Sequence, residues 1–370
     1  MKNKVSLARL LKTWNNADRK PRFLQRSLPV LVLAACLLFC GCSQKQAEPA
    51  RYEQTFFDVF DTVTTVIVYS GDEDAAQRTI DEAHEMLVRY HKLFDIYNTY
   101  EDLNNLCTVN QNAGNAPVPV DEDILDLIAF GKEMYETTDG ALNIAMGSVT
   151  ALWTEYREAG LDDPDHAALP PQDELEEAGR HTDIGGVVTD RTAGTLYLAD
   201  EALRLDVGAI AKGYAVQRVV EQLKSEGAGS LLISAGGNVC AVGTKADGSN
   251  WKIGIQDPYS GGYLLAVRVD DRSLVTSGTY ERYYTVDGKA YHHIIDPKTL
   301  YPSVYYDSVS VLCADSALAD ALTTGLFCIP LEEGEALVAS LDGAEALWVL
   351  PDGTQTASAG FEAYVVSDGE

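Results

Sequence analysis

Apolar positions along the chain recur with two periods, and each period predicts a different kind of element. A spacing of three and four residues predicts an amphipathic helix over residues 74–94, with an apolar face made of Ile80, Ala83, Leu87, Tyr90 and Phe94. The same spacing predicts a second helix after Asp121, with acidic residues near its start and an inner face made of Ile124, Leu127, Ile128, Met134 and Tyr135. Two more helices are expected, one over Ser316–Phe327 and one that begins after a turn at Gly208.

Strand patterns occupy much of the remaining chain. Residues 56–69 are rich in Val and Thr and predict a strand, and residues 187–207 alternate around a turn at Asp200 and Glu201, which predicts a hairpin. Shorter strands are expected at residues 251–255, 263–269, 283–286 and 309–312. Strands and helices are intermixed without a regular βα repeat, so the fold class is α+β. Because no linker or internal repeat interrupts residues 56–370, we expect a single large domain of one or two lobes.

The first 41 residues have the features of a targeting segment. Eight Lys and Arg side chains against one Asp precede an apolar run over residues 28–39, which is short for a transmembrane helix. The run ends in Gly41 and Cys42, as at a bacterial lipoprotein cleavage site. The sequence therefore predicts a signal peptide at residues 1–41, a lipidated Cys42 and a flexible tether at residues 43–55, on the extracytoplasmic side of the cell membrane. An uncleaved signal anchor is the alternative.

Charge and cysteine usage narrow the classes of partner. The formal net charge is −28, and removal of a leader with seven net positive charges leaves about −35. Such a surface repels nucleic acid and does not suit a polybasic membrane contact. Residues 158–177 are rich in Pro, Asp and Glu and fit a solvated surface insertion without chemistry. Four cysteines follow Cys42 without a Cys-x-x-Cys pair, which favours buried thiols over a disulfide framework.

Residues 205–213 carry the first chemical signal. They read Leu-Asp-Val-Gly-Ala-Ile-Ala-Lys-Gly, an apolar approach to Asp206 followed by a turn at Gly208 and a helix with Lys212 in its first turn. A strand-to-helix turn of this kind directs backbone N–H groups and the positive helix end at an anion such as phosphate. Lys212 adds a full charge, and Asp206 could accept a hydrogen bond from a hydroxyl or ring N–H of the ligand. An ordinary strand–turn–helix with a solvated lysine accounts for these residues equally well.

Four later segments combine with this one. Residues 234–238 read Ser-Ala-Gly-Gly-Asn, residues 276–282 read Thr-Ser-Gly-Thr-Tyr-Glu-Arg, residues 292–297 read His-His-Ile-Ile-Asp-Pro and residues 319–325 read Ala-Asp-Ala-Leu-Thr-Thr-Gly. In this order the set resembles the ApbE family, the FAD:protein FMN transferases, and the likeness runs over residues 57–350. The resemblance implies a Mg²⁺-dependent enzyme that takes FAD as its substrate. It would move FMN onto a Thr or Ser hydroxyl of an acceptor protein and release AMP.

Asp320 and Thr324 form the candidate metal site. They are four residues apart on the expected helix, so their oxygens project from one face. A carboxylate and a hydroxyl on a mostly apolar helix are consistent with a hard-cation site, and a buried Asp held by backbone donors is the alternative. The resemblance implies that both bind Mg²⁺ together with the backbone carbonyl of Ala209. Thr323 lies about 100° away around the helix and is left out.

The resemblance also implies contacts to FAD. Phe60 lies where the family has Met in a Met-Gly-Thr segment, and Tyr97 matches an aromatic residue beside the flavin. In residues 138–143, Leu142 and Asn143 replace the Phe and Asp of the family's Thr-x-Gly-Ala-Phe-Asp segment. The implied FAD-binding residues are Phe60, Tyr97, Ala141, Leu142, Asn143, Asp206, Lys212 and Ile295. Core packing is the alternative for Tyr97 and Ile295.

His293 is the candidate for proton transfer. An imidazole accepts a proton near neutral pH, and the following Ile-Ile-Asp-Pro favours a fixed extended backbone. Its neighbour His292 would point to the opposite side of a strand, and a surface histidine is the alternative for His293. Leu300 departs from the family, which usually has Gly in this Asp-Pro-x-Thr-Gly-x-Pro stretch, so the loop backbone is expected to differ.

Two other functions would use the same pocket. One is a lipoprotein that binds FAD without turnover, and the other is an enzyme that hydrolyses FAD to FMN and AMP. The transferase reading requires an acceptor protein with a Thr or Ser flavinylation site, and it implies membrane attachment through the lipid but no nucleic-acid partner.

Overall fold

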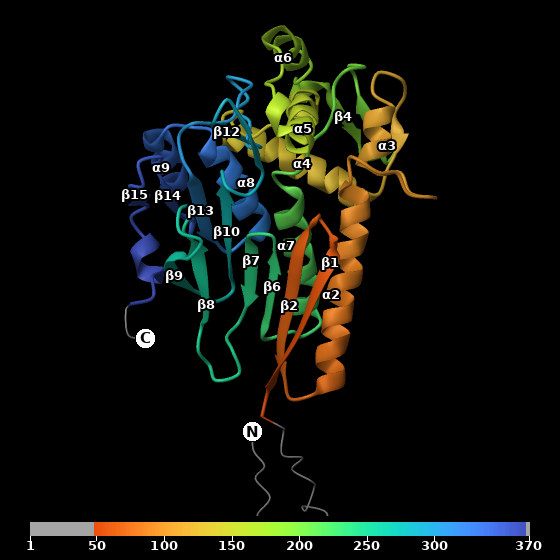
Figure 1. Cartoon of the computed structure of the whole chain (residues 1–370). Coiled ribbons are helices and arrows are strands. Elements are labelled where there is room, and N and C mark those ends of the chain that lie inside the picture. Colours follow the sequence, from red (N-terminus) through yellow and green to blue (C-terminus); the bar gives the residue numbers. More distant parts are fainter. Residues whose placement is uncertain (1–47, 368–370) are drawn as a thin grey trace, which may run out of the picture. The chain divides into compact units, whose positions relative to one another are not determined.

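An eight-stranded antiparallel sheet forms the centre of the computed structural model, which describes residues 48–367 (Figure 1). The predicted signal peptide and Cys42 lie outside the described residues. The strand order is β1-β2-β6-β7-β10-β13-β14-β15. The strands are β1 (Ala50–Val59), β2 (Thr62–Ser70), β6 (Leu231–Ala235), β7 (Asn238–Val242), β10 (Arg272–Gly278), β13 (Ser308–Cys313), β14 (Glu345–Val349) and β15 (Gln355–Ala357).

The first hairpin corrects two predictions. Strand β1 begins at Ala50 and pairs along its length with β2, so residues 50–55 belong to the sheet and not to the predicted tether. The single strand predicted over residues 56–69 is the end of β1, a two-residue turn at Phe60 and Asp61, and β2. Both turn residues have positive φ, 54° and 50°, as a type I′ hairpin turn requires. Without the glycine that usually marks such turns, the sequence reads as one continuous strand.

Helices cover one face of the sheet. Helix α2 (Glu73–Phe94) packs on β1 and β2, and α8 (Ser316–Phe327) packs on β10 and β13, with α7 (Ala211–Ser225) between the two helices (Figure 1). The predicted apolar stripe of α2 is buried, which confirms the periodicity argument. Helix α8 has the predicted bounds, and buried side chains surround it because it packs against the sheet, α7 and α4. The short α9 (Leu331–Ser340) follows and contacts β14.

The opposite face of the sheet is covered by a hairpin and the C-terminal segment. Strands β8 (Trp251–Gln256) and β9 (Tyr263–Val269) form the hairpin, which matches the prediction for both segments. Trp251, Val267 and Val269 pack there in a buried cluster with Phe361 of a short 3₁₀ helix, Phe361–Tyr364. Alternate residues of the central strands therefore meet two different apolar layers, as expected for a sheet that is buried on both faces.

A group of helices and short strands lies beyond one end of the sheet (Figure 1). The helices are α3 (Leu106–Gln111), α4 (Glu122–Thr137), α5 (Gly147–Asp162) and α6 (Gln172–Gly179), with 3₁₀ turns at Pro164–His166 and Ile184–Gly186. The strands are β3 (Val118–Pro119), β4 (Val187–Asp190), β5 (Thr195–Leu198), β11 (Tyr283–Val286) and β12 (Lys289–His292). The helix predicted after Asp121 is α4, which Asp121 caps through its side chain.

Two predictions in this region are wrong in detail. The hairpin predicted over residues 187–207 turns at residues 191–194, where Gly194 has a φ of 66°, while Asp200 and Glu201 follow the second strand. Residues 158–177 are not an irregular insertion, because they include the end of α5 and the start of α6, whose Leu175 is buried. The acidic composition of this segment correctly indicated a solvated surface, but it did not indicate the two helices that form there.

The described residues form one compact unit of mixed helices and antiparallel strands, which confirms the α+β prediction. Within residues 48–367, no helix has both the length and the apolar character that crossing a bilayer requires. The four cysteines that follow Cys42 are free and buried, as predicted, and they are Cys107, Cys240, Cys313 and Cys328.

Candidate functional site

The crossing of α7 and α8 holds the candidate metal ligand Asp320. Its Oδ2 accepts a hydrogen bond of 2.7 Å from the backbone N–H of Gly213, and its Oδ1 lies 3.8 Å from Nζ of Lys212. Asp320 is 4% exposed, and burial raises the pKa of its carboxyl group while Lys212 and the Gly213 N–H oppose that rise. The carboxylate is therefore buried beside one cation and one backbone donor.

Ala209 and Thr324, the other two predicted ligands, supply neutral oxygens. Ala209 directly precedes Ile210, the N-cap of α7, and no hydrogen bond among the described residues ends on its carbonyl. Thr324 is half-buried one turn beyond Asp320. Its neighbour Thr323 is fully buried, accepts a hydrogen bond from Ser277 at 2.9 Å and donates to the Asp320 carbonyl at 2.7 Å, which explains why it is not available as a ligand.

The donor set at this junction fits magnesium better than zinc. Within residues 48–367, no group of three or more His, Cys, Asp or Glu side chains could hold a metal ion. One carboxylate, one carbonyl and one hydroxyl are oxygen donors, and Mg²⁺ usually completes its shell with water and substrate phosphates. The Ala209 carbonyl is the observation that favours a cation there, because it belongs to a half-buried residue and accepts no hydrogen bond from the described residues.

The two adjacent histidines have different environments. His292 ends β12, is buried against Phe327, donates from Nε2 to the Ser303 carbonyl at 2.8 Å and accepts at Nδ1 from the Ile294 N–H at 3.2 Å. Both of its ring nitrogens are therefore engaged in structure. His293 points the other way and is exposed, as the sequence predicted for alternate strand positions.

The backbone at Arg282 fixes the tautomer of His293. The Arg282 carbonyl accepts from the His293 backbone N–H at 3.0 Å and lies 3.2 Å from Nδ1 of the same residue. A carbonyl can only accept, so Nδ1 carries the proton and Nε2 keeps a free lone pair. Although part of the His293 side chain reaches solvent, desolvation by the protein packed around the ring lowers its pKa to about 3, and the positive charges of Arg282 and, less strongly, Lys212 lower it further, so the ring stays neutral at physiological pH.

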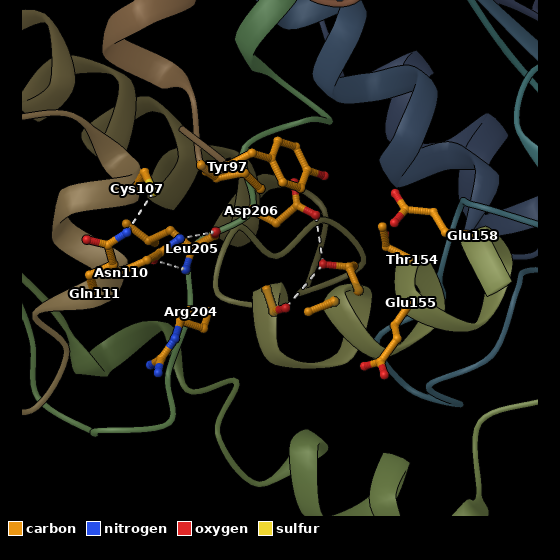
Figure 2. A pocket seen from close by; sticks show the side chains of 14 residues that line it. Tyr97, Cys107, Asn110, Gln111, Thr154, Glu155, Glu158, Arg204, Leu205 and Asp206 are labelled. Carbon is orange, nitrogen blue, oxygen red and sulfur yellow. Dashed lines mark hydrogen bonds between the residues drawn. The ribbon is translucent and has the colours of Figure 1, made fainter. Parts of the chain in front are cut away.

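A cavity of about 610 Å³ lies on the N-terminal side of α7 (Figure 2). Asp206 lines it, and Tyr97 stands beside Asp206 with 66% of its surface exposed. Desolvation raises the pKa of Tyr97, and the negative charge of Asp206 adds to this effect. Its volume falls in the usual range for small-molecule sites of about 300–1,000 Å³. Five residues lie between Asp206 and Lys212 in the chain, so the cavity and the candidate metal site share one segment.

Two residues that the sequence did not indicate hold Asp206 in place. Asn110 on α3 accepts from the Leu205 N–H at 2.7 Å and donates to the Leu205 carbonyl at 3.0 Å (Figure 2). Thr150 on α5 donates to Oδ2 of Asp206 at 2.7 Å, while the Gly208 N–H donates to its Oδ1 at 2.9 Å. Side chains that bind a backbone segment far away in sequence leave no periodic signal, which is why neither residue was predicted.

The other residues predicted to contact FAD pack or form hydrogen bonds within the protein. Ala141, Leu142 and Ile295 are buried in hydrophobic clusters and are not among the residues that line the cavity. Asn143 donates to the Thr182 carbonyl at 2.9 Å and accepts from the Ala145 N–H at 2.9 Å. Phe60 is half-buried in the β1–β2 turn, where its N–H donates to His91 at 3.2 Å.

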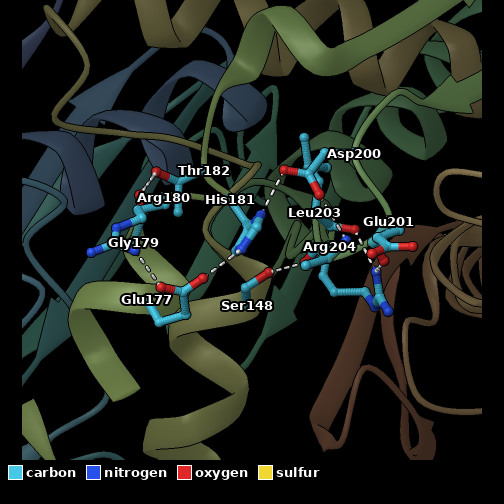
Figure 3. Close-up of polar contacts among 11 residues, drawn as sticks. Ser148, Glu177, Gly179, Arg180, His181, Thr182, Asp200, Glu201, Leu203 and Arg204 are labelled. Atoms are coloured by element: carbon cyan, nitrogen blue, oxygen red, sulfur yellow. Dashed lines mark hydrogen bonds and ion pairs between the residues drawn. The ribbon is translucent and has the colours of Figure 1, made fainter. Parts of the chain in front are cut away.

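A polar cluster around His181 joins α6 to the loop that begins at Asp200 (Figure 3). His181 lies between two carboxylates, with Nδ1 2.6 Å from Asp200 and Nε2 3.6 Å from Glu177 of α6. The hydrogen bond to Asp200 is the main reason that the pKa of His181 is raised, and the charges of both carboxylates add to it. Asp200 begins the loop that continues through Arg204, a lining residue, to Asp206. The cluster thus ties α6 to this loop.

Comparisons with known proteins show the family of the chain. The model of the ApbE family matches residues 60–348. An FAD:protein FMN transferase of Treponema pallidum is 36% identical, with 90% of this chain and 92% of that protein covered. An FAD:protein FMN transferase of Klebsiella pneumoniae is 34% identical over 76% of this chain and 84% of its own length. The crystal structure of an ApbE protein from Thermotoga maritima superposes with a TM-score of 0.76 at 29% identity, and covers 86% of this chain and all of that one.

Proposed function

The chain belongs to the ApbE family, and from this premise we propose that it transfers FMN from FAD to an acceptor protein. The observation that carries the proposal is the shared segment from Asp206 to Lys212. It joins a cavity large enough for part of a dinucleotide to a buried carboxylate and a lysine that suit its phosphates. The enzyme is a transferase with FAD as its substrate.

We propose Mg²⁺ as the cation at the α7–α8 junction. Asp320, Thr324 and the carbonyl of Ala209 would hold it, and the predicted ligands fit because the carbonyl has no other partner among the described residues. When bound, Mg²⁺ would offset the negative charge that develops on the phosphate oxygens. Lys212 adds a second positive charge at the same place, since its Nζ lies close to Asp320.

His293 is proposed as the general base. The Thr or Ser hydroxyl of the acceptor forms a new bond from its oxygen to the phosphorus on the FMN side of FAD. The bond from that phosphorus to the bridging oxygen breaks, and AMP leaves with this oxygen. Nε2 of His293 takes the proton of the hydroxyl, because Nδ1 is protonated and held by the Arg282 carbonyl. Asp206 and Tyr97 would bind the substrate in the cavity.

One experiment separates transfer from the two rival functions. The protein is incubated with FAD, Mg²⁺ and a candidate acceptor protein, and covalent flavin is sought by in-gel fluorescence and mass spectrometry. Covalent FMN on a Thr or Ser of the acceptor is expected. Free FMN and AMP without covalent product would establish hydrolysis instead, and unchanged FAD that co-purifies with the protein would establish storage. An acceptor whose target hydroxyl is changed to Ala is the control.

We also propose a lipid anchor at Cys42 and a site on the extracytoplasmic side of the membrane. The support is the apolar run that ends at Gly41 and Cys42 in the sequence. Cys42→Ala is expected to abolish lipid labelling and to leave the precursor unprocessed, as measured by metabolic labelling with a fatty-acid analogue and by gel mobility. Processing and labelling as in the parent protein would refute the lipoprotein assignment in favour of an uncleaved anchor.

A further inference from the structure

We propose that Gly213 is the positioning residue of the metal site, because its backbone N–H holds Asp320 at the start of α7, where the Ala209 carbonyl is open for the cation. The inference rests on the proposed function in one respect, that the cation binds at this junction. It explains why the predicted ligands are arranged as they are. One hydrogen bond and the absence of a side chain at position 213 bring the Asp320 carboxylate to the start of α7.

The start of α7 leaves the N–H of Gly213 without a partner inside its own helix. Ile210 is the N-cap, so Gly213 is the third helical residue, and the N–H groups of the first turn have no carbonyl acceptor within the helix. The first intrahelical bond is the one that Tyr214 donates to the Ile210 carbonyl at 3.0 Å. Gly213 donates to Oδ2 of Asp320 at 2.7 Å. The Ala209 carbonyl, which precedes the N-cap, has no donor among the residues that the structure describes.

Only glycine permits this contact. A Cβ at position 213 would lie 2.4 Å from Cβ of Asp320 and 2.4 Å from the Ser316 carbonyl oxygen, well inside van der Waals contact. The second of these atoms is backbone, so α8 would have to move away from α7. Such a movement would lengthen the Gly213–Asp320 hydrogen bond and shift the Asp320 carboxylate away from the start of α7.

The sheet fixes the same junction from a third side. Asn238, the first residue of β7, accepts a hydrogen bond from Ser316 at 2.9 Å through its Oδ1. Its Nδ2 would lie only 3.1 Å from a Cβ at position 213. The first turn of α8 is therefore held between α7 and the sheet, which sets how deeply Asp320 reaches toward Gly213.

The hydrogen bond from Gly213 also determines which oxygen of Asp320 would bind a cation. Oδ2 is committed to the Gly213 N–H, so Oδ1 is the oxygen that remains for metal. A single carboxylate oxygen, a carbonyl and a hydroxyl leave several positions for water and phosphate oxygens. This suits Mg²⁺, which keeps near-ideal octahedral geometry and gives up its waters reluctantly.

The first test compares two glycine-to-alanine variants by calorimetric titration with Mg²⁺ alone, without FAD. Gly213→Ala is expected to weaken Mg²⁺ binding at least tenfold. Gly160→Ala is the matched control, because a Cβ at that helical position would lie 2.7 Å from the Tyr284 ring, far along the chain from the junction. It is expected to bind Mg²⁺ as the parent protein does. Equal Mg²⁺ affinity in Gly213→Ala and the parent would overturn the inference while the metal site stands.

A second measurement does not depend on the folding of Gly213→Ala. Lys212-Gly213 is the only Lys-Gly step in the sequence, so ¹³C-carbonyl lysine with ¹⁵N-glycine labelling selects this one amide in an NMR spectrum. Its proton is expected to resonate downfield in the parent protein and to move upfield in Asp320→Asn, because a neutral amide is a weaker acceptor than a carboxylate. An amide proton that does not move would show that Gly213 does not hold Asp320. If the parent binds no Mg²⁺, the proposed metal site and the inference both fail, whatever the amide shows.

Discussion

The two ends of the site are built on opposite principles. At the α7–α8 junction, Asp320 is buried and held by a backbone N–H, and a helix crossing that admits no side chain at Gly213 fixes its position. At the cavity, Asp206 is held by the Thr150 hydroxyl and by a turn, and the neighbouring Tyr97 is largely exposed. The buried end suits a step that needs fixed charges, and the open end suits a ligand that must enter and leave.

The largest effect is expected from loss of the buried carboxylate. Asp320→Ala should lower the rate of flavin transfer by about 10⁴-fold, since stabilisation of phosphoryl charge by a metal is worth several kcal/mol. Transfer is measured at saturating FAD over a range of Mg²⁺ concentrations. Asp315→Ala is the matched control, because this carboxylate caps the same helix by accepting from the N–H groups of Ala317 and Leu318. It should cost about 1 kcal/mol of stability and leave the Mg²⁺ dependence unchanged. Full activity of Asp320→Ala at limiting Mg²⁺ would place the cation elsewhere.

The adjacent histidines test whether one residue has a catalytic role and its neighbour a structural role. His293→Ala should slow transfer by about 10²- to 10⁴-fold with little change in FAD affinity, because Nε2 is its free base and Nδ1 only orients the ring. His292→Ala removes two buried hydrogen bonds and should mainly lower the melting temperature, with a much milder effect on transfer. Rates at saturating FAD are compared with binding titrations and melting curves. Equal losses of rate, or a loss explained by weaker binding, would remove His293 from the mechanism.

A moderate effect is expected at the open end. Thr150→Val removes the hydroxyl that donates to Asp206 and should weaken FAD binding by about five- to tenfold, which corresponds to the net value of about 1 kcal/mol for a typical intramolecular hydrogen bond. Thr154→Val, one turn later on α5, changes a residue that also lines the cavity but makes no hydrogen bond to Asp206. Fluorescence titration with FAD measures both. A similar loss in the two variants would mean that cavity polarity, and not the placement of Asp206, determines affinity.

The smallest effect is expected from a substitution in the polar cluster around His181. The pKa of His181 is raised in the folded protein, so its contact with Asp200 stabilises the fold below the unfolded pKa near 6.5 and is lost as the pH rises through the folded value. His181→Gln should therefore lower the melting temperature by roughly 1–2 °C at pH 5.5 and by less at pH 9, because the pair is partly exposed. Thermal unfolding at both pH values provides the measurement. An equal decrease at both would assign the effect to packing alone.

The sequence predicted best the features that repeat over many residues. The stripe of α2 and the bounds of α8 follow from helical periodicity, which a buried face imposes on every turn. The turns were harder to predict. Phe60 and Asp61 adopt positive φ without a glycine, and the polar pair Asp200 and Glu201 was mistaken for the turn that Gly194 makes. Local backbone choices of this kind are decided by tertiary pairing and not by composition.

The site was predictable only where its residues share a motif. Asp206 and Lys212 lie on one short segment, and a separate motif at residues 319–325 indicated Asp320. Asn110 holds Leu205 across 95 positions in sequence, and no pattern in either segment points to the other. Ala141 and Ile295 follow the family pattern, yet they pack in hydrophobic clusters, because position in a motif does not specify the direction of a side chain.

Because its four thiols are buried, the fold is resistant to cysteine oxidation. Burial raises the pKa of Cys240 to about 11 and that of Cys313 to about 12, so little thiolate forms at physiological pH, and thiolate is the species that oxidants attack. The same sequence can therefore fold under reducing or oxidising conditions with one set of contacts. The rate at which a thiol reagent labels the native protein therefore measures how often the structure opens. The reagent labels the sheet cysteines only when the strands separate, whereas Cys107, at the wall of the cavity, reports on motion of the open end.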